Sequence, residues 1–173
     1  MGERTYITAP TGRQAAEYRE FLNRNMAYHK PWVHHSTDLD YFDQYLRRIK
    51  RGVTQGCFVL EVKSDRLLGV ININNILLGP IRSASLGYYG DRNYAGTGHM
   101  TEAMGLVLKY AVEDLGLHRL EANIQPGNIP SIRLVQKLGF TKEGFSPKYL
   151  QIAGKWRDHE RWAILDEDIL LIK

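Results

Sequence analysis

The stretch Arg92-Asn93-Tyr94-Ala95-Gly96-Thr97-Gly98-His99-Met100-Thr101-Glu102-Ala103-Met104 joins a strand-like run to a long helical pattern. The run 84–89 is apolar, and apolar residues then recur every three or four positions, which predicts a helix over 97–115. A glycine turn at the start of a helix presents backbone N–H groups at the positive end of the helix dipole, where anions such as phosphate bind. The stretch therefore predicts an anion site between a strand and a helix.

The spacing of the two glycines excludes two common phosphate-binding motifs. A P-loop requires Gly-x-x-x-x-Gly-Lys-Ser/Thr, which does not occur in the chain. A dinucleotide-binding fingerprint requires a third glycine where Thr101 stands, and its unit follows the first strand of the domain. Without further context, the remaining Gly-x-Gly is equally compatible with a purely structural turn.

Composition indicates one soluble domain spanning residues 1–173. Apolar residues make up 43% of the chain and charged residues 24%, as in ordinary globular proteins. No apolar run approaches the roughly 18 residues that span a bilayer, and the N-terminus has no apolar signal core. We therefore expect a cytoplasmic protein that does not bind membranes.

Charge and cysteine content exclude several kinds of partner. The net charge of +4 suits an anionic cofactor, but no block of Lys and Arg marks a nucleic-acid arm. The single cysteine, Cys57, alternates with Val59 on an expected strand, so we expect it in the core. The chain shows no ligand cluster with metal-binding spacing, and we expect no metal.

The periodic pattern predicts seven strands and four helices. We expect strands at 6–8, 56–63, 67–78, 83–89, 119–124, 140–145 and 155–165, and helices at 14–25, 39–51, 97–115 and 129–138. Asp38 and Asn128 are expected to cap the second and fourth helices, and 26–37 reads as an irregular loop that carries His34 and His35 on the surface. A helix between strands implies a parallel pair, whereas hairpins are antiparallel, so the sequence predicts an α/β (α+β) fold with a mixed sheet.

The order of these elements, the glycine turn and a later Asn-x-x-Ser helix resemble the GNAT acyltransferase superfamily. The chain is most similar to the ribosomal-protein N-terminal acetyltransferases of the RimJ/RimL type. This resemblance runs from about residue 14 to the end and is carried by 86–88, 96–103, Asn123 with 128–131, 138–144, 149–150 and 154–159. It implies the GNAT fold, a mostly antiparallel central sheet of about seven strands with helices on both faces.

The resemblance also implies a binding site for acetyl-CoA. In this family the amides of the glycine turn bind the pyrophosphate, and the fourth strand carries the pantetheine arm. The residues that match these roles are Gly87, Tyr88, Tyr89, Arg92, Asn93, Ala95, Gly96, Thr97, Gly98, His99, Met100, Asn128 and Ser131. Asn93 replaces the usual Arg or Gln, which puts one side-chain contact in doubt, and the adjacent Arg92 can substitute for it.

Ser131 matches the serine that protonates the leaving thiolate in RimL-like enzymes, and Asn128 matches the asparagine that holds the pantetheine. Both residues also have a purely structural interpretation, because Asn128 is a good helix cap and Ser131 lies in the first turn. Pro130 has no N–H, so the Asn128 side chain would accept from the N–H of Ser131. Such a bond could direct Ser131 into the cleft.

The general base is where the family pattern fails. Lys148 stands at the position of the glutamate that RimL-like enzymes use, and Ser85 replaces the fourth-strand glutamate of other relatives. Deprotonating an α-amine of pKa about 7.7–8.0 at pH 7 costs about 1 kcal/mol, against about 4.6 kcal/mol for a lysine side chain. The missing glutamate therefore favours an N-terminal amine. His159, Glu160 and Glu61 remain candidate bases, although each also fits a solvated strand residue.

These inferences predict an N-acetyltransferase that acts by direct transfer in a ternary complex. The expected acceptor is a protein N-terminus, such as that of a ribosomal protein. The alternatives are an acetyltransferase of small amines, such as polyamines, and a CoA-binding module without turnover. The acceptor-side segments 26–43 and 149–160 are mixed in charge, which does not support a polyamine site. His34 and His35 follow Trp32 in the region where the family builds the acceptor site and are candidates to line it, although a surface loop is the simpler interpretation. The sequence leaves monomer and homodimer open.

Overall fold

The computed structural model describes residues 2–36, 38 and 40–172, and within them seven strands form one mixed sheet. The sheet order is β1-β2-β3-β4-β5-β7-β6. The strands are β1 (Thr5–Thr8), β2 (Thr54–Glu61), β3 (Leu67–Leu77), β4 (Ser83–Gly90), β5 (Arg119–Ile124), β6 (Thr141–Ile152) and β7 (Lys155–Leu165). The helices are α1 (Ala15–His29), α2 (Tyr41–Lys50), α3 (His99–Glu113), α4 (Ile129–Lys137) and α5 (Asp166–Ile169). This confirms the expected fold.

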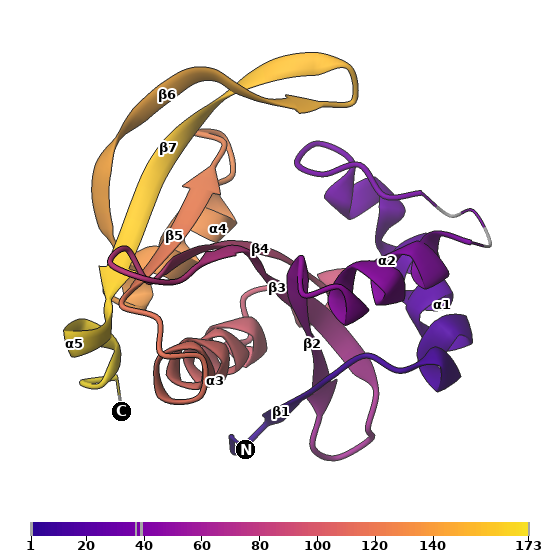
Figure 1. Cartoon of the computed structure of the whole chain (residues 1–173). Coiled ribbons are helices and arrows are strands. Elements are labelled where there is room, and N and C mark those ends of the chain that lie inside the picture. Colours follow the sequence, from indigo (N-terminus) through magenta and orange to yellow (C-terminus); the bar gives the residue numbers. More distant parts are fainter. Residues whose placement is uncertain (1, 37, 39, 173) are drawn as a thin grey trace.

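The sheet opens between β4 and β5, the two strands that run parallel. Their pairing extends from Ser83 with Arg119 to Leu86 with Ala122, and no later pair joins them in the described part of the chain. Beyond this point β5 pairs only with β7, while β4 pairs only with β3. The sheet therefore divides into two wings, β1–β4 and β5-β7-β6, that diverge in space (Figure 1).

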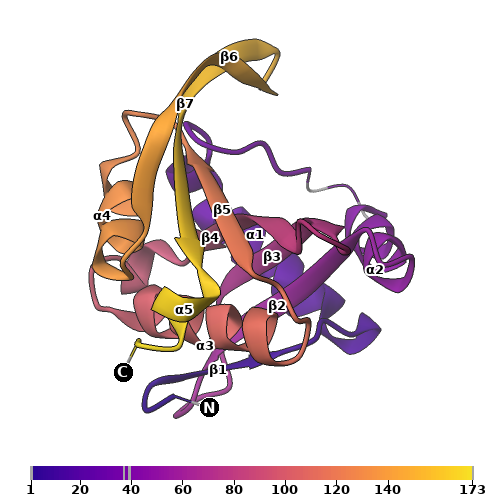
Figure 2. The same cartoon turned by 60° about the vertical axis from the view of Figure 1, so that its left-hand side comes forward.

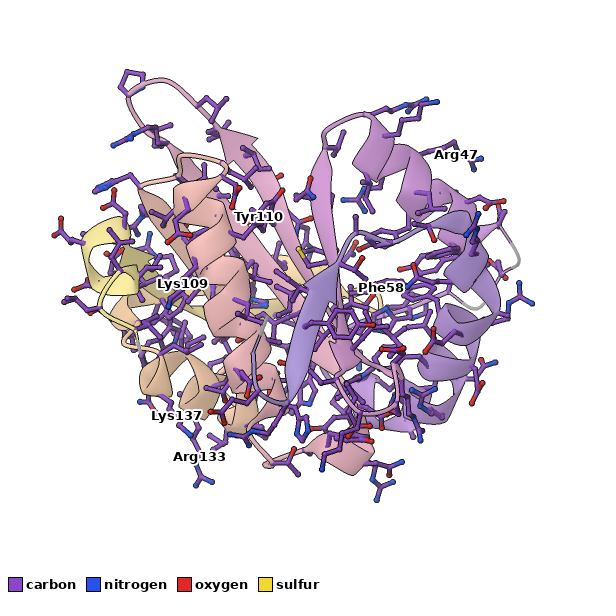
Figure 3. All side chains as sticks on the ribbon, turned by 90° about the horizontal axis from the view of Figure 1, so that it is seen from below. Arg47, Phe58, Lys109, Tyr110, Arg133 and Lys137 are labelled. Carbon is purple, nitrogen blue, oxygen red and sulfur yellow. The ribbon has the colours of Figure 1, made fainter. Side chains whose placement is uncertain are left out.

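Helices cover both faces of the sheet because the central strands are apolar on both sides. On β2, Cys57 and Val59 pack into a core with α3 and α4, whereas Phe58 and Leu60 pack into a second core with α1 and α2. Figure 3 shows α3 and the α1–α2 pair on opposite sides of the strands. Alternating side chains on a strand point to opposite faces, which is why one strand can serve two cores. Cys57 is buried, as expected.

The structure corrects the expected boundaries of the first two helices. Helix α1 continues to His29, so residues 26–29 are helical and not part of the loop. Its last turn is held by distant backbone, because Asn25 accepts from the Arg92 N–H at 2.8 Å and His29 Nε2 donates to the Gly90 carbonyl at 2.8 Å. Asp40 takes the N-cap position of α2 in place of Asp38, and Leu39 lies outside the described residues.

Strand β6 is longer than expected and forms an arched hairpin with β7. The two strands pair as far as Ile152 with Lys155, with register shifts near Gly144 and between Ser146 and Leu150. Pro147 disrupts the strand pattern in the sequence, but β6 is an edge strand, where a missing N–H is tolerated. The hairpin extends beyond the body of the molecule in both views (Figures 1 and 2).

Throughout residues 2–36, 38 and 40–172, no helix is long and apolar enough to cross a membrane.

Candidate active site

A cleft of about 1720 Å³ lies where β4 and β5 separate. Its lining comes from the end of α1 and the following loop, from β4, the glycine turn, α4 and the β6–β7 hairpin. The opening leaves Gly87, Tyr88 and Tyr89 without a β5 partner, and all three line the cleft. The divergence of two parallel strands thus creates the cavity and exposes a strand edge along it.

The glycine turn begins α3 in a conformation that favours glycine. Gly96 has φ of 76° and Gly98, the N-cap of α3, has φ of 88°. A Cβ at Gly96 would meet no atom within 4 Å, so the backbone there is open to a ligand. Since the first amides of a helix lack intrahelical partners, this turn offers free N–H donors to the cleft.

Two arginines from elsewhere in the chain, Arg24 and Arg4, hold the turn in place. Asp91 accepts from the Asn93 N–H at 3.0 Å and from Arg24 Nε at 2.8 Å. Arg4 donates to the Thr97 carbonyl at 2.8 Å and places its guanidinium against Gly98. Arg4 was not predicted as part of this site, because a contact across so many residues leaves no local pattern in the sequence.

The predicted cofactor residues divide into those that line the cleft and those that support it. Gly87, Tyr88, Tyr89, Ala95, Gly96, Gly98, Met100, Asn128 and Ser131 line it. Arg92, Asn93, Thr97 and His99 are outside the lining set, and the Thr97 hydroxyl contacts the Tyr94 carbonyl at 2.6 Å and His99 Nδ1 at 2.7 Å. The backbone N–H groups of Arg92 and Asn93 bond to Asn25 and Asp91, so the second group contributes to the conformation of the turn and not to the lining.

Ser131 is held at the cleft by two partners. Its N–H donates to Asn128 Oδ1 at 3.4 Å, which confirms Asn128 as the cap of α4. Its hydroxyl lies 2.6 Å from that of Tyr88, on β4. Burial raises the pKa of Tyr88 to about 12, and the hydrogen bond with Ser131 opposes the rise only in part. Tyr88 therefore keeps its proton at neutral pH. Sequence reasoning assigned Tyr88 only backbone contacts and did not predict this pair.

The three candidate bases lie in different surroundings. His159 is buried and lines the cleft, with Nδ1 3.0 Å from the Arg157 carbonyl. Burial lowers the pKa of His159. Glu160 is paired with Lys142 and accepts from Trp162 Nε1 at 3.0 Å, whereas Glu61 accepts from Ser64 at 2.5 Å. Neither glutamate lines the cleft. The geometry therefore brings only His159 of these three to the cavity.

Asp91 is the one carboxylate among the described residues that line the cleft. Burial tends to raise the pKa of Asp91, but the Asn93 N–H and Arg24 hold it below its ordinary value. Its charge is thus already matched by Arg24, with Arg66 3.9 Å away. In the part of the chain that the structure describes, no group of three or more His, Cys, Asp or Glu side chains could hold a metal ion.

The wall of the cleft formed by α1, α2 and the loop between them is aromatic and polar. The Tyr18 and Tyr89 hydroxyls lie 2.9 Å apart, and Tyr45 donates to Asn72 Oδ1 at 2.6 Å. His34 is exposed, as expected, but His35 is half-buried with its ring centroid 4.2 Å from that of Tyr89. The expectation of a surface position is therefore wrong for His35, because the loop folds back onto β4.

Comparison with known proteins identifies the family. Residues 4–141 match the family described as acetyltransferase (GNAT) domain. This match covers most of the chain, which therefore belongs to the GNAT acetyltransferase family and is an N-acetyltransferase, as expected from its sequence. Members of this family use acetyl-CoA.

Individual relatives support this assignment. A probable N-acetyltransferase of Bacillus subtilis, YjcK, is 38% identical over 125 residues, which are 72% of this chain and 69% of that protein. The ribosomal protein uS5-alanine N-acetyltransferase of Escherichia coli is 37% identical over 110 residues, 64% of this chain and 57% of the relative's length. The solved structure of ribosomal-protein-S5-alanine acetyltransferase from Vibrio fischeri superposes with a TM-score of 0.87 at 25% identity, covering 97% of this chain and 96% of that one.

Proposed function

We propose that this chain transfers an acetyl group from acetyl-CoA to a protein N-terminal α-amine, as on a ribosomal protein. One observation supports this most directly: a single cleft joins the open glycine turn, the free edge of β4 and the Ser131–Tyr88 pair. The named activity of the Escherichia coli relative is consistent with this acceptor. Residues 1–173 would act as one domain, since both helical layers pack on the same sheet.

The cleft fits acetyl-CoA at three places. The amides of Gly96 and Gly98 and the N-terminus of α3 suit a pyrophosphate, because the turn has free donors and open space. The unpaired edge of β4 offers backbone groups to a pantetheine amide chain. Arg133 and Lys137 line the same cleft from α4 (Figure 3) and add positive charge next to the anion. When bound, acetyl-CoA supplies an activated thioester.

Ser131, supported by Tyr88, would donate the proton that the departing thiolate takes up. The Ser131 hydroxyl, half-buried on the first turn of α4, is placed to donate a proton into the cleft. Tyr88 Oη, 2.6 Å away, can orient that hydroxyl and return a proton to it. Because burial raises the pKa of Tyr88 to about 12, the pair remains protonated at neutral pH.

His159 is the best-placed group to accept the amine proton. In its neutral form Nδ1 carries the hydrogen that faces the Arg157 carbonyl, which leaves a lone pair on Nε2. An α-amine needs only a weak base, as its deprotonation at pH 7 costs about 1 kcal/mol. We therefore assign this role to His159, whereas Glu160 is engaged by Lys142 and Trp162 outside the cleft.

A polyamine acceptor is the alternative with a small substrate, and the charge of the cleft opposes it. A polyamine carries further ammonium groups besides the one that reacts. The one carboxylate on the described lining, Asp91, is already paired with Arg24. An N-terminal peptide presents a single amine followed by neutral amides, which suits a cleft without free negative charge.

A thiol-release assay with acetyl-CoA tests the proposal. We expect release with peptides that begin with Ala, Ser or Met and with amino-acid amides or esters that mimic such an N-terminus, and little with spermidine or simple alkylamines. Reaction of small amines alone would refute the N-terminal acceptor. Ser131→Ala should keep CoA binding in calorimetry and lose turnover, whereas no turnover by the unmodified chain with any amine would favour a CoA-binding module.

A further inference from the structure

Two imidazoles on the α1 side of the cleft, one buried and one half-buried, each have a ring nitrogen without a partner among the described residues. His29, the last residue of α1, is 4% exposed, and its Nε2 lies 2.8 Å from the Gly90 carbonyl. A carbonyl only accepts, so Nε2 carries the hydrogen and Nδ1 of the neutral ring holds a lone pair. This Nδ1 is inaccessible to solvent and makes no hydrogen bond among the described residues.

His35 repeats this feature on the facing loop. Its Nε2 is also inaccessible and has no hydrogen-bond partner in the described part of the chain. The rings of His29 and His35 lie 5.2 Å apart at 69°, and each packs against Tyr89. Both rings line the cleft. Buried polar atoms in proteins are nearly always hydrogen bonded, so two unpaired nitrogens on residues that line the cleft indicate a place where a ligand group binds. Because both nitrogens are covered in this structure, the rings must shift locally to admit that group.

The two rings are neutral at physiological pH. Burial lowers the pKa of His35 to about 4, and His29 and His34 contribute to the decrease. Burial also lowers the pKa of His29, against the opposing effects of the Gly90 carbonyl and Asp91. Proton transfer to His35 from an α-amine of pKa about 8 is unfavourable by about ten-thousand-fold. These rings therefore suit recognition through hydrogen bonds and not general-base catalysis.

We propose that His29 and His35 form an acceptor subsite that binds an uncharged hydrogen-bond donor, a hydroxyl or an amide N–H, carried by the amine substrate. The inference rests on the proposed function and deepens it. His29 Nδ1 can only accept, which requires a donor on the ligand. The His29 and His35 rings line the same cleft as Ser131, so the donor and the reacting amine can belong to one substrate.

An ammonium group is a poor occupant of this subsite. A cation that leaves water requires a compensating negative charge, and the carboxylate on this lining, Asp91, is held by Arg24. A neutral hydroxyl or amide loses less hydration free energy when it moves from water into the subsite, and one hydrogen bond to a neutral nitrogen compensates for that loss. The subsite would thus select amines whose neighbouring group is polar but uncharged.

Two pairs of amines isolate the donor. Serinamide and 2-aminobutanamide differ in a hydroxyl against a methyl, and alaninamide and alanine methyl ester differ in an amide N–H₂ against an ester oxygen. With saturating acetyl-CoA, we expect kcat/KM to favour the donor-bearing member of at least one pair by about tenfold or more. His35→Phe should reduce that ratio to within about threefold without changing CoA affinity. His118→Phe is the control, because His118 pairs with Asp166 outside the cleft lining.

Equal rates within both pairs, or an unchanged ratio in the His35 variant, would overturn the subsite. A second measurement needs neither turnover nor a variant: nitrogen NMR of imidazole-labelled protein with CoA and serinamide or alaninamide. We expect the His29 Nδ1 resonance to shift with the amine and not with CoA alone. A resonance that neither amine moves would show that no donor of the substrate reaches His29 Nδ1, and this would refute the inference even if the enzyme is active. A shift without turnover would support the subsite and refute only the proposed reaction.

Discussion

Replacing Tyr88 by phenylalanine tests whether Tyr88 and Ser131 act together. The change removes one hydroxyl from a partly buried side chain and leaves the ring, so packing on β4 is conserved. It deletes the 2.6 Å contact to Ser131. A hydrogen bond between neutral groups contributes about 0.5–1.5 kcal/mol, so Tyr88→Phe alone should lower kcat by about 2- to 13-fold. Ser131→Ala removes the proton donor itself and should lower kcat by about 10²- to 10⁴-fold.

The double variant gives the decisive comparison. If Tyr88 acts only through the Ser131 hydroxyl, then Tyr88→Phe should have no further effect once Ser131 is alanine, because residues that act as a unit are not additive. Turnover is followed by thiol release and CoA affinity by calorimetry, and the affinity should stay unchanged in each variant. Tyr110→Phe on α3, outside the cleft lining (Figure 3), is the matched control. Full additivity in the double variant would refute the proposed pair.

Three further predictions follow from the geometry. Gly96→Ala places a side chain at φ of 76°, a conformation that costs about 1–2 kcal/mol, so CoA affinity should fall about 5- to 30-fold in calorimetry. The control is Gly139→Ala, at φ of 88° away from the cleft, which should lower the stability of the fold and leave CoA affinity unchanged. His159→Gln should lower kcat/KM for an N-terminal peptide about 10²-fold at pH 7 and less at pH 9, where the amine is already deprotonated. Glu160→Gln should lower the free energy of unfolding by at most about 1 kcal/mol. A larger rate loss in the Glu160 variant than in the His159 variant would make Glu160 the base. Because the pKa of His35 is lowered to about 4, the unfolded chain binds more protons than the folded one between about pH 6.5 and pH 4. Thermal stability should therefore fall as the pH drops through this range, and should fall less steeply in His35→Phe. Equal slopes for both proteins would contradict the burial of the His35 ring.

Local sequence was sufficient for the features that depend on neighbouring residues. The apolar spacing after Gly98 and the cap at Asn128 involve contacts within one or two helical turns, and the structure confirms both. The alternation through Cys57 and Phe58 gives one strand two apolar faces, consistent with helices on both sides of the sheet. Propensity and periodicity act over such short distances, which makes these elements predictable from one sequence.

Longer-range contacts account for the boundaries that were wrong. Helix α1 extends to His29 because its last turn bonds to the backbone of residues 90 and 92, and nothing in the local sequence signals those partners. Strand β6 continues past Pro147 because it pairs with β7 at the sheet edge. In both cases a tertiary contact compensates for a weak local preference.

The sequence by itself determined the family, the seven strands along the chain, the glycine turn and Ser131 as the candidate proton donor. Only the tertiary structure brought Tyr88 onto Ser131, Arg4 onto the turn, and His35 against His29 and Tyr89. The physical reason is distance along the chain: a motif records spacing within one segment, whereas each of these contacts joins residues from separate segments. Such contacts exist only once the two wings of the sheet diverge and the helices pack against them.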